Sequence, residues 1–254
     1  MPLVTLLTDF GTADSYVAEM KGVLLTRAPG TTLVDVTHAI PPGDVAVGAY
    51  VLGRAWHRFP RGTVHLAVVD PGVGTRRAAL ALRAGEHLFV GPDNGLFTEV
   101  LHDRAVEIVT LAAPAGVAPT FHGRDLFAPA AAALARGATL PELGEPLRTQ
   151  PVRLARAEPR YEGDVLVGDV IYVDRFGTLV TNLGADAVPP DARIEVQGLD
   201  LGPLRRTFGD VPSGALVAFP GSGGTIEIAV RDGSAAARLD VGVGGRVRAR
   251  RGAG

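Results

Sequence analysis

Asp70 and Arg77 combine residue types and a spacing that could form a catalytic site. Asp70 follows a short apolar run that predicts a buried strand, and Pro71 cannot extend a strand ladder. Gly72 and Gly74 then indicate tight turns before Arg77. Because the carboxyl ends of strands border the ligand crevice of an open α/β sheet, we expect a site here. A structural aspartate in an ordinary Asp-Pro-Gly turn is the alternative.

Two more acids and one histidine are further candidates. Asp9 and Asp35 are expected at strand ends, where a short carboxylate can bind adjacent hydroxyls or orient a water molecule. His122 opens a predicted helix, and a histidine there can act at neutral pH. The structural alternatives are turn caps for the acids and a buried histidine that is hydrogen-bonded to backbone.

The remaining residue pattern argues against a metal or a nucleotide-binding loop. The chain has no cysteine, which excludes disulfides, thiolate nucleophiles and cysteine-ligated zinc. No glycine-rich dinucleotide fingerprint or phosphate loop is present, so we expect no cofactor. The other histidines show no metal-ligand spacing: His38, His57, His65, His87 and His102.

The first part of the chain predicts an α/β domain. Strands are expected at residues 3–7, 33–36, 62–69, 80–82, 87–90 and 105–111. Helices are expected after Asp14 or Ser15, after Asp44 and after His122. Alternation of strands and helices predicts a parallel or mixed sheet, and we expect a central sheet that is mostly parallel. Residues 84–86 predict a hairpin turn.

The second part predicts a small all-β barrel. Prolines from about residue 137 indicate a linker, which places the boundary near 160 and gives domains 1–160 and 161–254. Short strands are expected at 165–173, 177–183, 193–196, 216–219, 225–230 and 245–250. Polar and aromatic residues gather around Asp174, and residues 221–224 form a flexible turn; alone, both turns indicate hairpins.

Composition excludes some classes of partner. A net charge of −2 over 254 residues gives no electrostatic case for nucleic acid or an anionic membrane. No apolar run approaches the roughly 18 residues of a membrane-spanning helix. The first residues lack the basic start and cleavage site of a secretory signal, so we expect a cytoplasmic protein.

Ordered motifs along nearly the whole chain carry a family resemblance. The chain resembles the S-adenosylmethionine hydrolases, also called SAM hydroxide adenosyltransferases, which are related to the fluorinases and chlorinases. The motifs are Thr8-Asp9-Phe10-Gly11, Met20-Lys21-Gly22, Val34-Asp35-Val36-Thr37-His38, Val69-Asp70-Pro71-Gly72-Val73-Gly74, Gly91-Pro92-Asp93-Asn94-Gly95, Phe121-His122-Gly123-Arg124-Asp125 and Asp174-Arg175-Phe176-Gly177.

The resemblance implies a reaction and an assembly. Water attacks C5′ of the adenosyl group and releases adenosine and L-methionine, without a metal or cofactor. The fold is an α/β domain followed by a β-barrel, in a homotrimer whose trimers can pair. The active site then lies between the first domain of one subunit and the second domain of its neighbour.

The resemblance also implies roles for residues of the first domain. The family's catalytic triad falls on Asp70, Arg77 and His122. In this hypothesis Asp70 and His122 hold the water, Asp70 accepts its proton, and Arg77 fixes Asp70 and keeps it ionised. Asp9 matches the acid that binds the ribose hydroxyls, and Asn94 lies in the loop near the nucleoside.

Residues of the second domain match the rest of the substrate site. Asp174, Phe176 and Ser222 correspond to positions that hold the methionine part or cover the adenine. Thr178 stands where the family usually has asparagine, so the paired amide recognition of adenine is lost.

Two other functions stay open at this stage. A halogenase of the same fold is one, but the chain lacks the fluorinase insertion between Arg77 and Phe89 and keeps Asp70 and Arg77, which halogenases lack. A non-catalytic adenosine-binding protein is the other.

Overall fold

The chain divides into two units that we describe separately. The structure is a computed structural model that describes residues 1–102, 105–113 and 116–252. The units are Met1–Leu154 and Ala155–Gly254. The division falls slightly before residue 160 because the segment up to Leu154 is held by the first unit. The backbone N–H of Val152 donates to Asp93 at 2.8 Å, and that of Leu154 donates to the Thr98 hydroxyl at 2.9 Å.

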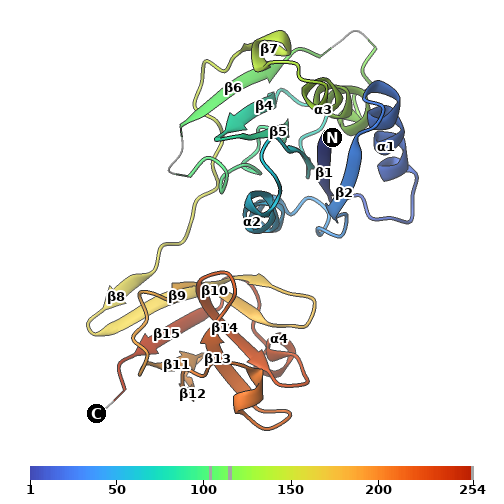
Figure 1. Ribbon diagram of the computed structural model, residues 1–254. Coiled ribbons are helices and arrows are strands. Elements are labelled where there is room, and N and C mark those ends of the chain that lie inside the picture. Colours follow the sequence, from blue (N-terminus) through green and yellow to red (C-terminus); the bar gives the residue numbers. More distant parts are fainter. Residues whose placement is uncertain (103–104, 114–115, 253–254) are drawn as a thin grey trace. The chain divides into compact units, whose positions relative to one another are not determined.

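One sheet forms the centre of the first unit (Figure 1). Its strands lie in the order β2-β1-β3-β5-β4-β6-β7. In chain order they are β1 Leu3–Thr8, β2 Thr32–Thr37, β3 Val64–Val68, β4 Ala79–Ala84, β5 His87–Pro92, β6 Val106–Leu111 and β7 Gly144–Pro146. The strands β2, β1, β3 and β5 are parallel neighbours, whereas β4, β6 and β7 add antiparallel pairings.

The sheet is therefore mixed: three neighbouring pairs are parallel, as expected, and three are antiparallel, so the parallel part is smaller than predicted. The predicted hairpin at residues 84–86 is confirmed, and Gly85 adopts φ +59° in its tight turn. This reversal makes β4 antiparallel to β5, and β6 continues the antiparallel half. The strand β7 lies within the segment that was expected to be only a linker. Its Pro146 is tolerated because β7 is the edge strand.

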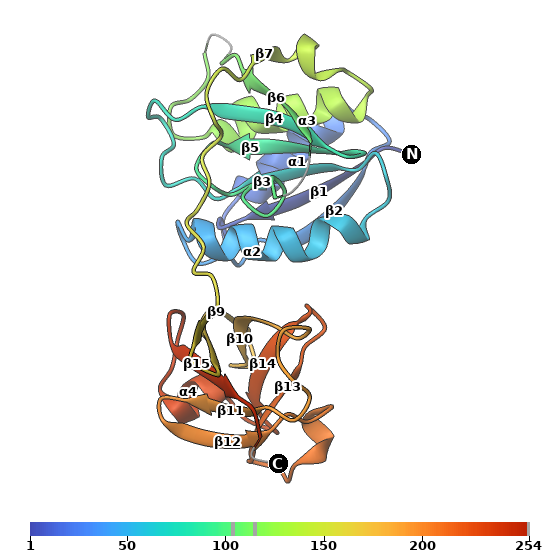
Figure 2. The ribbon, with the colours of Figure 1, turned by 90° about the vertical axis from the view of Figure 1, so that its left-hand side faces the viewer.

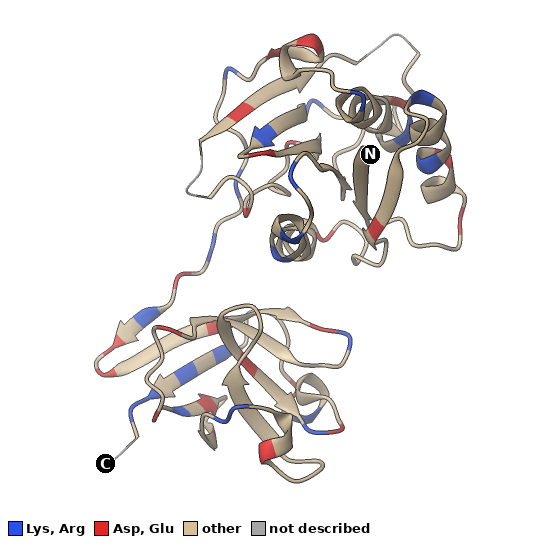
Figure 3. Cartoon of the chain, in the orientation of Figure 1, with Lys and Arg blue, Asp and Glu red and all other residues tan. Residues whose placement is uncertain are grey.

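Helices cover both faces of this sheet (Figure 2). The helices α1 (Tyr16–Arg27) and α3 (Ala128–Ala135) pack on one face, where Met20, Leu24 and Phe127 join a core with residues of β1 and β3. Helix α2 (Val45–Ala55) covers the other face with Leu52 and the following Trp56. The helix expected after Asp44 is confirmed, and Asp44 caps it, because its carboxylate accepts from the Val47 N–H at 3.0 Å. The strands β1, β3 and β5 between these layers carry no charged residue of the kinds coloured in Figure 3.

The second unit is a curled, barrel-like sheet with strand order β12-β11-β15-β9-β10-β14-β13, and β8 pairs with β9. Its elements are β8 Arg160–Glu162, β9 Val165–Val173, β10 Leu179–Gly184, β11 Arg193–Val196, β12 Leu199–Pro203, β13 Leu216–Pro220, β14 Thr225–Val230, α4 Ala235–Leu239 and β15 Arg246–Arg250. The two ends of the sheet approach each other, since the N–H of Arg205, just after β12, donates to Ala218 of β13 at 2.8 Å. The short helix α4 was not expected.

A buried polar chain crosses three strands of the first unit. The Thr5 hydroxyl lies 2.8 Å from Nδ1 of His65, and Nε2 of His65 lies 3.1 Å from Nδ1 of His87. His65 is 0% exposed and stacks on Phe89 with ring centroids 4.8 Å apart. Burial, with a smaller effect of His87, lowers the pKa of His65 from 6.5 to about 3. His65 is therefore neutral in the folded protein at ordinary pH.

We expect His65 to make the first unit acid-sensitive. Unfolded His65 binds a proton below pH 6.5, whereas folded His65 does so only near pH 3, so its contribution to stability is complete above 6.5 and is lost as pH falls. Urea unfolding followed by fluorescence of the single tryptophan, Trp56, should show a slope of up to about 1.4 kcal/mol per pH unit in that window. His65→Gln should flatten the slope, and His57→Gln, at an exposed position, should not. An unchanged slope in His65→Gln contradicts the assignment.

Candidate active site

Asp70 and Arg77 form a two-pronged ion pair within one loop. Asp70 lies just beyond β3, and the chain returns through Gly72 and Gly74 to Arg77 before β4 begins. Arg77 Nε donates to both carboxylate oxygens, at 2.9 and 3.0 Å, and its Nη2 also donates to Oδ2. The side chains are 4% and 9% exposed, so the pair is shielded from water.

The Arg77 guanidinium also binds His122, from a distant segment. Arg77 Nη2 lies 2.9 Å from Nδ1 of His122. Since arginine can only donate, Nδ1 must accept, and the proton of the neutral imidazole is on Nε2. Burial lowers the pKa of His122, as does the charge of Arg77, while Asp70 and Asp125 oppose the shift. The site thus holds a neutral imidazole whose Nε2–H is a donor.

Two features fix the guanidinium and the loop around it. Arg77 lies over the Phe127 ring, 5.2 Å from its centroid, and its Nη1 donates to the carbonyl of Ala78 at 3.3 Å. Gly74 has φ +77°, and a Cβ atom there would lie 2.8 Å from the carbonyl oxygen of Pro119. Only glycine suits this position, because it lets the Asp70 loop pack on the backbone that leads to His122.

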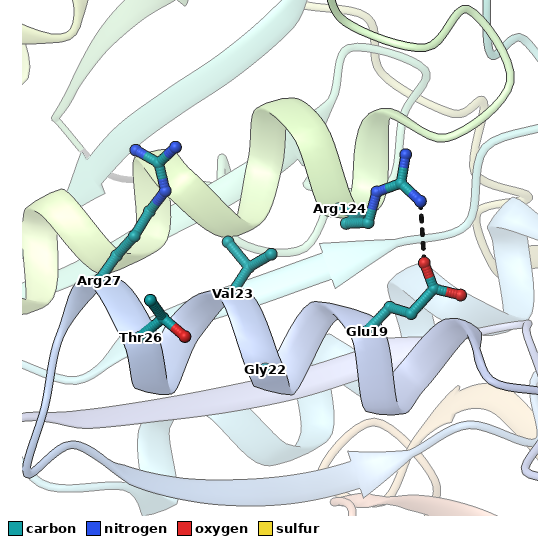
Figure 4. Close-up of a pocket in the computed structure, with 6 residues that line it drawn as sticks. All are labelled: Glu19, Gly22, Val23, Thr26, Arg27 and Arg124. Carbon is teal, nitrogen blue, oxygen red and sulfur yellow. Dashed lines mark hydrogen bonds and ion pairs between the residues drawn. The ribbon is translucent and has the colours of Figure 1, made fainter.

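A charged network holds the turn that carries His122. The helix expected here begins as a π-helical turn, Gly123–Phe127, which continues into α3. Arg124 donates to Asp125 at 2.6 and 2.9 Å and to Glu19 of α1 at 2.8 Å. Figure 4 shows the Arg124–Glu19 contact beside a depression of about 320 Å³ over α1. None of the predicted site residues lines that depression, so it is separate from the candidate site.

Asp9 and Asn94 lie at the same edge of the sheet as Asp70. They follow β1 and β5, which flank β3 in parallel. Asp9 Oδ2 accepts from the Gly43 N–H at 2.8 Å. Asn94 Nδ2 donates to the carbonyl of Val69 at 2.8 Å, and its Oδ1 accepts from the Leu96 N–H at 3.2 Å. Asn94 therefore braces the strand end that carries Asp70, while Asp9 lies on the neighbouring strand end.

The predicted residues of the second unit lie in two of its turns. Asp174 Oδ1 accepts from the N–H groups of Phe176 and Thr178, at 2.9 and 2.8 Å, and so shapes the turn after β9. Phe176 is 70% exposed, whereas Thr178 is only 5% exposed. Ser222 is exposed in the turn between β13 and β14.

The expected position of Asp35 was wrong, and the cluster of side chains around it was not predicted. Asp35 lies inside β2 and not at its end, because the strand continues to Thr37. Asp35 pairs with Lys21 at 2.6 Å and with His38 at 3.0 Å. His38 shows no metal-ligand spacing in the sequence, and its place directly after a predicted strand is the signal that could have identified it. Within the described ranges no group of three or more His, Cys, Asp or Glu residues could hold a metal ion.

The arrangement around His122 predicts a measurable titration. Arg77→Gln removes the positive charge that lowers the His122 pKa and leaves the opposing charge of Asp70, so the pKa should rise. NMR titration of the ring, assigned with a His122→Asn sample, measures this. Arg76→Gln, at an exposed neighbouring position, is the matched control and should leave the pKa unchanged. A His122 pKa that is unchanged or lower in Arg77→Gln contradicts the described contact.

No helix of the described residues has both the length and the apolar character to cross a membrane.

Comparison with known proteins identifies relatives along nearly the whole chain. A curated (R)-S-adenosyl-L-methionine hydrolase of Thermus thermophilus is 46% identical over 96% of this chain and 98% of its own length. A protein of the same name from Salinispora tropica is 43% identical, covering 97% of each chain. A fluorinase of an Actinoplanes species is 34% identical over 72% of each.

Solved structures and family models agree with these relatives. A conserved protein of Thermotoga maritima superposes with a TM-score of 0.91 at 36% identity, covering 98% of this chain and 100% of that one. Residues 4–144 match the N-terminal domain of SAM hydroxide adenosyltransferases, and residues 168–248 match the C-terminal domain. The chain belongs to the SAM hydroxide adenosyltransferase family.

Proposed function

We propose that this protein hydrolyses S-adenosyl-L-methionine to adenosine and L-methionine by attack of water on C5′ of the ribose. The observation that carries the proposal is that Asp70, from the same loop, and His122, from a distant segment, both bind the guanidinium of Arg77. Relatives at 46% and 43% identity bear the name of this activity.

The chemistry needs an oriented water more than an acid. An oxygen–C5′ bond forms while the C5′–sulfur bond breaks, and the sulfonium leaves as a neutral thioether. The protein must therefore hold a partly desolvated nucleophile in line with the breaking bond. The Nε2–H of His122 donates to the water oxygen and aims a lone pair of that oxygen at C5′.

Asp70 receives the proton that the water loses. Its Oδ1 accepts one N–H of Arg77, whereas Oδ2 accepts two, so Oδ1 keeps lone-pair capacity for a water proton. Arg77 holds the carboxylate in position and also fixes the tautomer of His122. Because Nδ1 of His122 is already an acceptor for Arg77, Asp70 is the better-placed proton acceptor.

The remaining residues recognise the rest of the substrate. Asp9 binds the ribose hydroxyls, with Oδ2 fixed by Gly43 and the carboxylate on the strand end next to Asp70. In the second unit, Asp174, Phe176 and Ser222 hold the methionine part or cover the adenine. The 70% exposure of the Phe176 ring supports a role in contacting a ligand or another subunit.

We further propose that the protein is a homotrimer, in which the second unit of one subunit completes the site on the first unit of its neighbour. Support comes from the family membership and from the polar turns at Asp174 and Ser222, whose residue types suit a substrate with charged and aromatic parts. The buried position of Thr178 supports a role in the turn more than direct recognition of adenine.

Two observations favour water over halide as the nucleophile. The connection between β4 and β5 is a tight turn at Gly85, so this chain lacks a long insertion of the kind expected of a fluorinase there. The Asp70 carboxylate, beside the proposed water position, would repel a halide anion. A protein that only binds adenosine would not need the paired carboxylate and oriented imidazole.

One assay separates these functions. Purified protein incubated with S-adenosyl-L-methionine should yield adenosine and methionine in equal amounts by chromatography, with and without added chloride or fluoride. Reaction in ¹⁸O-labelled water should place the label on the adenosine 5′-oxygen. A 5′-halogenated nucleoside would instead identify a halogenase. Adenosine binding without any product would identify a binding protein.

A further inference from the structure

His38 is buried beside the candidate site but contacts none of the proposed catalytic groups. It is 6% exposed, and its neighbour Thr8, the last residue of β1, is 0% exposed. The Thr8 hydroxyl lies 2.8 Å from Nδ1 of His38. On the other side of the ring, Nε2 lies 3.0 Å from Oδ1 of Asp35, whose Oδ2 accepts from Lys21 at 2.6 Å.

The donor and acceptor roles in this chain can be assigned in order. Lys21 only donates and the Asp35 carboxylate only accepts, so the side of the ring facing Asp35 carries the proton. The Nε2–H is not aligned for a hydrogen bond, and its contact with Asp35 is electrostatic. In the neutral ring Nδ1 of His38 is then an acceptor, and the Thr8 hydroxyl donates to it. The oxygen of Thr8 remains free to accept the N–H of Phe10, at 3.2 Å.

The segment from His38 to Gly43 holds the Asp9 loop at further points. The carbonyl of His38 accepts from the N–H of Gly11 at 2.8 Å. The N–H of Gly43 donates to Oδ2 of Asp9 at 2.8 Å. Asp9 thus lies between anchors at Thr8, Gly11 and Gly43, all made by one neighbouring segment or its histidine ring.

We propose that His38 is a positioning residue: through Thr8 it sets the backbone that orients the Asp9 carboxylate, and it thereby determines affinity for the nucleoside ribose. The proposal rests on the function proposed for Asp9 above. His38 touches no reacting atom, so it acts on binding and not on the chemical step. The expected mark of this role is a change in KM and in adenosine Kd with little change in kcat.

Two near-isosteric variants of His38 separate its contact with Thr8 from its contact with Asp35. His38→Asn places an amide oxygen where Nδ1 lies and can accept from Thr8, but it cannot reach Asp35. His38→Gln places an amide near Nε2 and loses the Thr8 contact. Thr8→Val keeps the branched shape and removes the hydroxyl. We expect adenosine Kd to rise about tenfold in His38→Gln and in Thr8→Val, and to stay within about threefold of wild type in His38→Asn.

The double variant Thr8→Val/His38→Gln should bind adenosine no more weakly than either single variant. The two single variants and the double variant all lack the contact between Thr8 and His38. Calorimetry with adenosine, thermal unfolding and steady-state kinetics are measured on the same full-length samples. Equal weakening in His38→Asn and His38→Gln, additive losses, or a fall in kcat at unchanged Kd would overturn the proposal. Wild type that binds adenosine without hydrolysing S-adenosyl-L-methionine would refute the proposed function, while the affinity comparison would still test the positioning role.

Discussion

The structure of the candidate site depends on one guanidinium. Arg77 donates to both oxygens of Asp70 and to Nδ1 of His122, so a single planar group relates the carboxylate to the imidazole. Arginine suits this task because its donors diverge in a rigid plane and its charge persists at every ordinary pH. Near-complete burial of both members of the ion pair strengthens the contacts and makes the loss of either partner costly.

The fold brings the ends of separate strands to the edge of the sheet where that guanidinium lies. The parallel strands β1, β3 and β5 deliver Asp9, Asp70 and the bracing Asn94 to one edge of the sheet. The α/β arrangement makes such an edge because its strands point the same way between two helical layers. His122 comes from a separate segment, as the residue that precedes a π-helical turn held to α1 by Arg124.

Much of this could be predicted from the sequence. The strand-acid-turn pattern located Asp70 and Asp9, and the hairpin at Gly85 followed from turn residues between apolar runs. The direction in which strands pair could not be predicted as well, because a short apolar strand has the same sequence pattern beside a parallel or an antiparallel neighbour. The strand β7 was missed for a related reason: its proline indicates a break, and only the sheet edge makes it acceptable.

Contacts between residues far apart in the sequence could not be predicted from periodicity alone. Nothing local indicates that His38 accepts from Thr8 or that Gly74 packs on Pro119, since these contacts depend on the tertiary fold. The family resemblance supplied the grouping of Asp70, Arg77 and His122, and the structure adds which atoms meet. It also adds the tautomer of His122, which fixes which ring nitrogen faces the proposed water.

The most direct test of this account is the turnover of Arg77→Lys with S-adenosyl-L-methionine, measured beside Arg76→Lys. A lysine is a point donor and cannot serve the carboxylate and the imidazole together. The account predicts that kcat falls about 100-fold in Arg77→Lys while adenosine affinity is kept, and that Arg76→Lys behaves as wild type. A kcat of Arg77→Lys close to wild type would contradict the claim that one guanidinium organises the site.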